Sequence, residues 1–442
     1  EKRIIKDFCN FDWLNNNIQY EEINKILKEE REKSLQDFEN AIFKDVKNNV
    51  NKLNLKLECT GCRMCEQICP KNAIKMEEDE EGFIRPVVDK SLCINCGLCI
   101  KRCPQRNLLD KNIENQTAYA AKLKDLEVLK ESSSGGIFSV LANEYIKNNG
   151  KIYGAAFDEK FNVVHVGVEN LEGLKRLRGS KYVQSDTANT YTEVKNDLAN
   201  NIKVLYSGTA CQIAGLKNFL GKDYENLLTI DIVCHGVPSP KMFRKYKEYI
   251  ENKYKGKIQE ISFRNKEKRG WGLNLKIKLD NGKIIRKFAY VDPYYKSFVK
   301  GDTYRECCYN CIYANSERIG DITLADYWGL ANVHPEFFDG RGVSAVIVNT
   351  KKGMDVWNNV KDKLEYINTS IESIKKYNPN LVGPTKKKKS RDYIYSGLDT
   401  KDFKRFCKEN LKFKKKLKDE IRGKFSDENI ERIKGKLKSK KY

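Results

Sequence analysis

The sequence has little histidine, proline and methionine, and it has no long apolar segment. Among 442 residues there are 3 histidines, 9 prolines and 4 methionines. The apolar runs, such as the one near residues 343–348, are far shorter than the roughly 20 residues of a membrane-spanning helix. The first residues also lack the apolar stretch of a secretory signal. No transmembrane segment is expected, and the cytoplasm is the expected compartment.

The chain is strongly basic, with a formal net charge of +22, which raises the question of nucleic-acid binding. More than half of the excess lies in residues 385–442, where 22 lysines and arginines stand against 9 acidic residues. This distribution predicts a solvated, basic helical tail. Docking of the tail to an acidic partner protein, a membrane surface or nucleic acid is the alternative. The rest of the chain is mildly basic, so nucleic acid is not the favoured partner.

Cysteine is abundant, with 15 residues. In a cytoplasmic chain this number favours metal binding or redox chemistry over disulfides. The spacing C-x2-C-x2-C-x3-C-P begins at Cys59 and recurs 34 residues later at Cys93. Two-cluster ferredoxins have this spacing, and the fourth cysteine of each run binds the other cluster. Zinc is the alternative, but zinc sites prefer separated C-x2-C pairs.

The pattern therefore predicts two [4Fe–4S] clusters, each held by four thiolates. One ligand set is Cys59, Cys62, Cys65 and Cys103, and the other is Cys93, Cys96, Cys99 and Cys69. Short strands are expected at residues 73–76 and 82–86. Such a module is too small to have its own substrate pocket, so we interpret it as an electron-transfer domain.

Strand-like and helix-like segments alternate from about residue 117 to residue 350, which is typical of an α/β or α+β domain. The segment Asp280-Asn-Gly282 between two alternating runs indicates a hairpin, and Ser239-Pro240 is a good helix start. Strands are expected at residues 151–157, 162–169, 203–207, 227–233, 321–324 and 343–348, and helices at residues 187–200, 211–220, 240–254 and 351–367.

Three loops have the composition of a binding site for a large anionic cofactor. Residues 132–136, Ser-Ser-Ser-Gly-Gly, open a helix whose free N–H groups favour phosphate, although a plain N-cap with a glycine turn is the alternative. Residues 178–182 add cations, hydroxyls and an aromatic ring. Residues 206–209 join a strand to a helix, where ligands bind in open α/β sheets.

Four further cysteines could complete a third four-thiolate site. They are Cys211, Cys234 and the pair Cys308-Tyr-Asn-Cys311. Buried structural thiols are the alternative for the first two, and zinc is the alternative for all four.

These segments resemble the coenzyme F420 hydrogenase/dehydrogenase beta-subunit family, including members with a dicluster ferredoxin module in front. The matching motifs occur in the family's order between about residues 55 and 395. They are Ser-Ser-Gly-Gly-Ile-Phe-Ser (133–139), Arg-Gly-Ser-Lys-Tyr-Val-Gln-Ser-Asp (178–186), Ser-Gly-Thr-Ala-Cys-Gln-Ile-Ala-Gly-Leu (207–216), Asp-Ile-Val-Cys-His-Gly-Val-Pro-Ser-Pro (231–240), Cys308-x-x-Cys311 and Asp-Ile-Thr-Leu-Ala-Asp-Tyr-Trp-Gly (321–329).

The resemblance implies an FAD-binding α/β (α+β) domain with a third [4Fe–4S] cluster close to the flavin. It implies that this cluster is held by Cys211, Cys234, Cys308 and Cys311, with Cys307 as a competitor for Cys308. The implied flavin contacts are Ser134, Gly135, Gly136, Ser180, Lys181, Tyr182, Ser207, Gly208, Thr209 and Gln212. The expected domains are a helical N-terminal extension (1–54), the dicluster domain (55–112), the flavin domain (113–384) and the basic helical tail (385–442).

The function implied is that of an oxidoreductase passing electrons between a hydride donor or acceptor and the ferredoxin-type clusters. Coenzyme F420 is the candidate substrate, and a ferredoxin or an oxidoreductase subunit is the candidate redox partner. Hydride transfer requires no protein general acid, so no catalytic residue is assigned; His235 is the histidine expected nearest the site. A non-catalytic electron-transfer adaptor and a ferredoxin-dependent reductase of another conjugated substrate are the alternatives.

Overall fold

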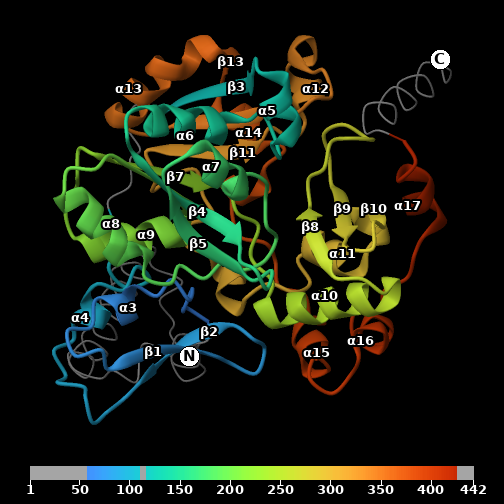
Figure 1. Ribbon diagram of the computed structural model, residues 1–442, viewed down its shortest axis with the longest axis horizontal. Helices are drawn as coiled ribbons and strands as arrows, with labels where there is room; N and C mark the ends of the chain where they lie inside the picture. Colours follow the sequence, from blue (N-terminus) through green and yellow to red (C-terminus); the bar gives the residue numbers. More distant parts are fainter. Residues whose placement is uncertain (1–56, 110–115, 426–442) are drawn as a thin grey trace, which may run out of the picture. The chain divides into compact units, whose positions relative to one another are not determined.

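The computed structural model describes residues 57–109 and 116–425, and these form a two-stranded, a three-stranded and an eight-stranded sheet (Figure 1). The extension predicted at residues 1–54 and the last residues of the basic tail lie outside the described residues. Within the described ranges, no helix has both the length and the apolar character needed to cross a membrane.

The dicluster region consists of one hairpin and two short helices. Strands β1 (Ile74–Glu78) and β2 (Ile84–Val88) pair antiparallel, which confirms the two strands expected here to within two residues. Helices α3 (Met64–Gln67) and α4 (Leu98–Lys101) each lie within a cysteine run. Phe83, in the hairpin loop, is fully buried and packs in a core that also contains Tyr246 and Phe263.

The large sheet is mixed and has the strand order β13-β3-β12-β11-β7-β6-β4-β5. Its central strands β4, β6, β7 and β11 run parallel, and the flanking strands pair antiparallel. The strands are β3 (Thr117–Leu123), β4 (Lys151–Phe157), β5 (Val163–Val168), β6 (Val204–Thr209), β7 (Leu227–Ile232), β11 (Ile322–Asp326), β12 (Ser344–Val348) and β13 (Leu364–Thr369).

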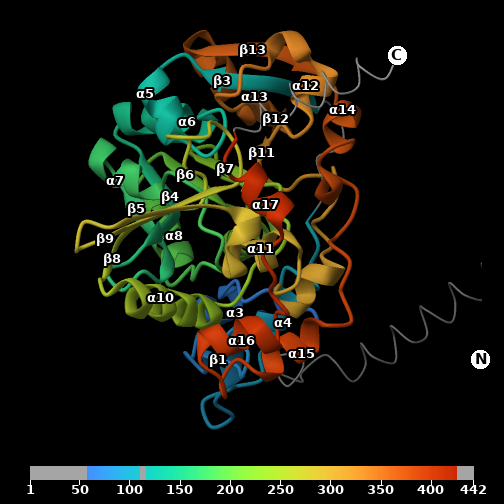
Figure 2. The same ribbon diagram turned by 90° about the vertical axis from the view of Figure 1, so that its right-hand side faces the viewer.

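Both faces of this sheet are buried. In β3, Tyr119 and Ala121 pack into one core, whereas Ala118 and Ala120 pack into another, as the two-residue period of a strand requires. One face is covered by α5 (Leu126–Glu131), α6 (Ile137–Lys147), α7 (Leu171–Leu177) and α13 (Lys351–Val360). The other face is covered by α8 (Thr190–Ala199), α9 (Ala210–Leu220), α12 (Leu330–Val333) and α14 (Ile371–Lys375) (Figure 2).

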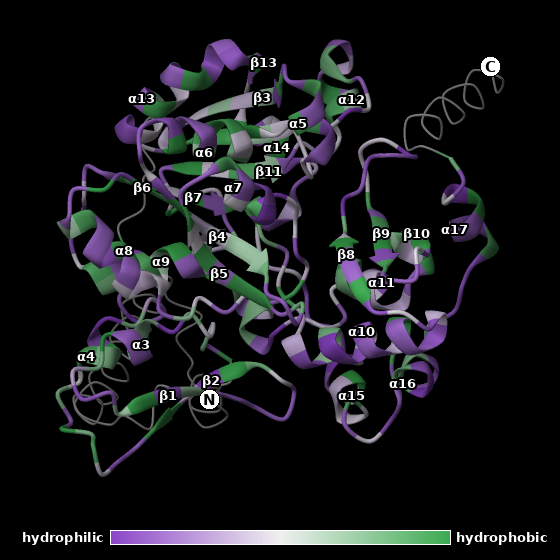
Figure 3. Ribbon diagram, viewed as in Figure 1, coloured by the Kyte–Doolittle hydropathy of each residue, from purple (hydrophilic) through white to green (hydrophobic). Residues whose placement is uncertain are grey.

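A smaller antiparallel sheet forms around the predicted 280–282 turn. Strands β8 (Ile258–Ser262), β9 (Asn274–Leu279) and β10 (Ile284–Phe288) pack with α10 (Pro240–Tyr254) and α11 (Pro293–Val299) on an aromatic core. Ser239 caps α10 as expected, because its hydroxyl accepts a hydrogen bond from the Met242 N–H at 3.0 Å. Figure 3 shows α10 as mostly hydrophilic and β5 as hydrophobic.

Two sequence expectations differ from the structure. The helix expected over residues 351–367 ends at Val360, and residues 364–369 form β13 instead. This segment pairs with β3, so backbone hydrogen bonding at a sheet edge overrides local helix propensity.

The second difference concerns the basic tail, which is not simply solvated. Residues 385–425 contain α15 (Arg391–Ser396), α16 (Phe403–Glu409) and α17 (Leu417–Arg422). Phe403, Phe406 and Cys407 are buried in the same core as α10. Apolar side chains between the lysines therefore anchor this segment, and most of its lysines remain exposed, whereas Arg391 is buried.

Candidate active site

A cavity of about 650 Å³ lies at the carboxyl ends of β6, β7 and β11. This volume is within the roughly 300–1,000 Å³ of cofactor and substrate sites, and the position is where open α/β sheets bind ligands. All three loops predicted to bind an anionic cofactor contribute to its wall. The sequence pattern and the fold thus agree on one location.

Two of these loops are joined by their serines. The Ser133 hydroxyl accepts hydrogen bonds from the Ser180 N–H at 2.7 Å and the Ser180 hydroxyl at 3.0 Å. Next to them, α6 begins after Gly136, which has a φ of 81° and provides no side-chain cap. Because the first N–H groups of a helix attract anions, this cavity-lining helix start fits a phosphate group.

Nine of the ten residues implied as flavin contacts line the cavity. The exception is Gly135, whose N–H donates to the Ser344 hydroxyl at 3.0 Å. A Cβ at Gly135 would lie 2.2 Å from the carbonyl oxygen of Ala121. Gly135 therefore allows its loop to approach β3 and β12 closely. The nine lining residues are Ser134, Gly136, Ser180, Lys181, Tyr182, Ser207, Gly208, Thr209 and Gln212.

The polar groups of two of these residues are engaged within the protein. The Lys181 ammonium donates to three backbone carbonyls at the end of α7, at 2.9–3.1 Å, and burial lowers its pKa to about 7. The Gln212 side-chain oxygen accepts from the Thr209 N–H at 3.0 Å, and its amide donates to the Ser185 hydroxyl at 2.9 Å. Both side chains hold the loops in shape.

The four cysteines of the predicted third site also line the cavity. Cys211 lies in the first turn of α9 and Cys234 follows β7, whereas Cys308 lies in the short 3-10 helix η4 (Glu306–Asn310) and Cys311 directly follows it. Within the described ranges, no three cysteine, histidine or acidic side chains are arranged to hold a single metal ion. A four-thiol donor set nevertheless fits a cubane, whose ligands bind four separate irons and therefore surround a larger volume.

Helix α9 connects the cavity to the dicluster region. Cys211 and Gly215 are four residues apart, so they share one face of the helix. A Cβ at Gly215 would lie 3.1 Å from the Cys62 sulfur, so glycine allows the Cys62 loop to pack directly on α9. Sequence reasoning missed Gly215, although a glycine inside a helix one turn after Cys211 was the available signal.

Sequence reasoning also missed Arg305 and Gln184, which join the two regions. Arg305 is fully buried and donates to the Cys59 carbonyl at 2.7 Å. Gln184 is 6% exposed, and its amide donates to the Thr60 carbonyl at 3.0 Å. Neither residue is part of a cysteine motif, and a long-range contact of this kind leaves no local sequence pattern.

Two histidines line the cavity, His235 as expected and His165 in addition. Burial lowers the pKa of both, in the case of His165 to about 4. The His165 Nε2 lies 3.1 Å from the Ser207 carbonyl oxygen, so Nε2 carries the proton and donates. Its Nδ1 is then a buried acceptor, and it has no hydrogen-bond partner among the described residues.

Asp326 also lines the cavity, and it forms an ion pair with Arg264. Arg264 donates to Asp326 at 2.8 Å, and the Trp271 indole N–H donates to the same carboxylate at 2.8 Å. Burial alone would raise the pKa of Asp326, but the charge of Arg264 keeps this pKa below its usual value. Asp326 therefore stays ionised and fixes the end of β11.

With this geometry in place, comparisons with known proteins identify the families. Residues 58–107 match the model of the 4Fe-4S dicluster domain. Residues 202–373 match the model of the C terminus of the coenzyme F420 hydrogenase/dehydrogenase beta subunit. Residues 202–373 thus contain the C-terminal region of this beta-subunit family, and residues 58–107 contain a 4Fe-4S dicluster domain. The F420 hydrogenase/dehydrogenase resemblance and the dicluster prediction are thereby confirmed, and the chain is an iron–sulfur protein.

Curated relatives match the dicluster domain of the chain. The ferredoxin-type protein NapF of Haemophilus influenzae is 32% identical over 59 residues, covering 12% of this chain and 34% of that protein. A component of the ion-translocating oxidoreductase complex of Methanosarcina acetivorans is 50% identical over 48 residues, covering 11% and 16%. An uncharacterized ferredoxin of Methanocaldococcus jannaschii is 35% identical over 57 residues, covering 13% and 73%. The chain thus spans about a third or less of the first two relatives.

Among solved structures, a chain of the F420-reducing [NiFe] hydrogenase complex of Methanosarcina barkeri matches with a TM-score of 0.40 and 18% identity. The match covers 69% of the present chain and 91% of the hydrogenase chain.

Proposed function

We propose that the chain is an FAD- and iron–sulfur-dependent oxidoreductase that passes electrons between a two-electron substrate and iron–sulfur clusters. The observation that carries this proposal is one cavity lined both by the three anion-binding loops and by Cys211, Cys234, Cys308 and Cys311. A cofactor bound by the loops would lie beside the four thiols. The direct packing of Cys62 on α9 extends the same path to the dicluster domain.

The protein's own groups have distinct roles in this proposal. The start of α6 and the serines of the joined loops bind the phosphates of FAD, and Lys181 and Gln212 hold those loops in shape. Neutral His165 offers its Nδ1 as a hydrogen-bond acceptor to a bound ring or hydroxyl. The four cavity cysteines hold a third [4Fe–4S] cluster. FAD, when bound, supplies hydride exchange and single-electron exchange with a nearby cluster.

The substrate and partner in this proposal come from the family. Coenzyme F420 is the proposed hydride donor or acceptor, and a ferredoxin or another oxidoreductase subunit is the proposed single-electron partner. The dicluster domain, residues 55–112, would exchange electrons with that partner, and residues 113–384 would bind the flavin.

Flavin binding by the loops can be tested by introducing a negative charge into one of them. Ser180→Glu introduces a carboxylate beside the expected phosphates, so the purified chain should lose most of its FAD while keeping its iron. Ser396→Glu, at an exposed serine of α15, is the matched control and should keep both. The FAD and iron contents of anaerobically purified protein give the result, and an unchanged FAD content in Ser180→Glu would refute the loop assignment.

The substrate is tested separately. Anaerobic addition of reduced coenzyme F420 should bleach the flavin absorbance of the wild-type chain. Bleaching by reduced ferredoxin but not by reduced F420 would keep the oxidoreductase and reject F420 as its substrate.

A further inference from the structure

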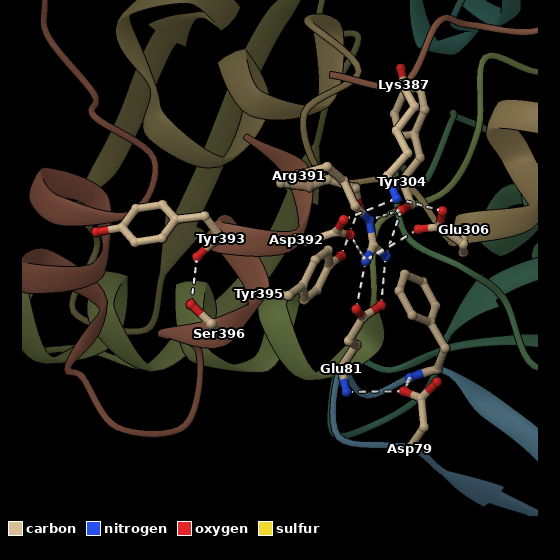
Figure 4. A network of polar contacts seen from close by, with 12 residues as sticks. Asp79, Glu81, Tyr304, Glu306, Lys387, Arg391, Asp392, Tyr393, Tyr395 and Ser396 are labelled. Atoms are coloured by element: carbon tan, nitrogen blue, oxygen red, sulfur yellow. Dashed lines mark hydrogen bonds and ion pairs between the residues drawn. The ribbon is translucent and has the colours of Figure 1, made fainter. Parts of the chain in front are cut away.

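Two fully buried arginines, Arg305 and Arg391, both bind the β1–β2 hairpin of the dicluster domain. The two guanidinium groups differ in the acceptors that surround them. Arg391 forms a bidentate ion pair with Glu81, with both distances at 2.5 Å, and donates to the Tyr304 carbonyl at 3.0 Å (Figure 4). The hydrogen bonds of Arg391 within the described chain include none to a cysteine. Its positive charge is therefore neutralised by a carboxylate.

Arg305 forms no ion pair with a carboxylate within the described residues. Its guanidinium donates to the carbonyls of Cys59, at 2.7 Å, and Ile84, at 2.9 Å, and to the Gln184 side-chain oxygen at 3.0 Å. Two sulfurs also face the guanidinium, namely that of Cys59, 3.5 Å from Nη2, and that of the buried Cys307. A buried guanidinium is costly unless an anion faces it. A ligating Cys59 thiolate supplies that anion.

The approach of Arg305 to the cysteine loop is built into the sequence. Gly61 has a φ of 69°, and a Cβ there would lie 2.7 Å from the Gln184 amide nitrogen and 3.0 Å from Arg305 Nη1. A glycine between Cys59 and Cys62 therefore gives the loop its left-handed turn and leaves room for both side chains. Three fixed oxygen acceptors then hold the guanidinium beside the sulfur.

We propose that Arg305 raises the reduction potential of the cluster bound by Cys59, Cys62, Cys65 and Cys103. Uptake of one electron adds one negative charge to a cluster and its thiolates. A fixed positive charge and an N–H···S hydrogen bond stabilise the more negative state, and net charge and hydrogen bonds to the sulfurs set cluster potentials. This inference rests on the proposed ligand role of Cys59 and is independent of flavin and substrate.

The test is a redox titration of the full chain with dithionite, monitored by the EPR signals of the reduced clusters. In Arg305→Gln, with wild-type iron content, one dicluster signal should shift to a more negative potential. Reduction should weaken by about tenfold, which is about 59 mV for a one-electron couple. Arg305→Lys keeps the charge without the planar fork and should shift in the same direction by less. Combined Arg391→Gln and Glu81→Gln replacement removes the neutral pair as a whole, and this matched control should leave both potentials unchanged.

Unchanged potentials in Arg305→Gln would overturn the inference. An equal shift in the variant that carries both Arg391→Gln and Glu81→Gln would also overturn it, because it would indicate a structural effect. If Arg305→Gln does not retain its clusters, the potentials of Arg305→Lys are used instead. Unchanged potentials in Arg305→Lys would then overturn the inference. The absence of both dicluster signals from the wild-type chain is a different outcome, because it would refute the proposed function itself.

Discussion

The molecule contains two groups of cysteines, both proposed to bind iron–sulfur clusters, and the two groups are brought together in different ways. The eight cysteines of the dicluster motif lie within 45 residues of sequence, from Cys59 to Cys103, in two short runs. The four cavity cysteines extend over about a hundred residues and approach one another through α9, β7 and η4. The first group is a property of the local sequence, whereas the second depends on the whole fold.

The largest predicted effect separates the two groups by their iron. Cys211→Ser and Cys308→Ser should each lose about four of about twelve irons while the dicluster EPR signals remain. Cys62→Ser should instead lose dicluster iron. Cys407→Ser, at a buried thiol outside the cavity, is the matched control and should keep all iron. Iron analysis of anaerobic protein checks this prediction, and full iron in both Cys211→Ser and Cys308→Ser would contradict it.

The next largest effect is on stability, and it concerns the ion pair that attaches the β1–β2 hairpin of the dicluster domain to the rest of the chain. Arg391→Ala removes the guanidinium that pairs with the buried Glu81 carboxylate, which should cost about 3–5 kcal/mol in the free energy of unfolding. Lys175→Ala breaks an exposed pair with Glu172 and should cost at most about 1 kcal/mol. Urea unfolding followed by circular dichroism measures both. Equal stability of the two variants would mean that the buried pair does not fasten the hairpin.

A substitution in the core of the large sheet tests whether the cavity cysteines depend on the fold more than the dicluster cysteines do. Ile230→Ala in β7, fully buried four residues before Cys234, should lower stability by about 2–5 kcal/mol. As urea is raised, the cavity iron should be released at lower urea than the dicluster iron. Simultaneous release of all iron from this variant would show that both groups depend equally on the large sheet.

The smallest predicted effect concerns pH. The folded-state pKa of His165, about 4, lies below the ordinary value near 6.5, so the unfolded chain binds more protons between these values. Stability should therefore fall as pH decreases through this window, by about 1 kcal/mol between pH 7.5 and pH 5.5 for this residue. His165→Gln should remove this part of the pH dependence. Thermal unfolding at the two pH values measures it, and an identical slope in the variant would contradict it.

The sequence predicted the elements whose determinants are local. The strand at residues 151–157, the Ser239 cap of α10 and the 280–282 turn follow from residue type and spacing, and the structure has all three. The prediction failed at β13 and in the basic tail, where pairing with β3 and burial of Phe403 and Phe406 override local preference.

The residues of the candidate site likewise include some that the sequence predicts and some that it does not. The loops around Ser133, Ser180 and Ser207 could be found because serine and glycine at strand and helix ends form a local pattern. Arg305 and His165 could not, because their roles come from contacts between residues far apart in the sequence. Long-range contacts of single side chains produce no repeating pattern in the amino-acid sequence.

The proposal that the chain binds three clusters and a flavin is tested most directly by the iron and FAD content of wild-type protein purified without oxygen. About twelve irons and one FAD per chain are predicted, for two clusters in the dicluster domain and a third beside the flavin. About eight irons and no flavin would contradict the account, and the cavity cysteines would then be ordinary buried thiols of an electron-transfer adaptor.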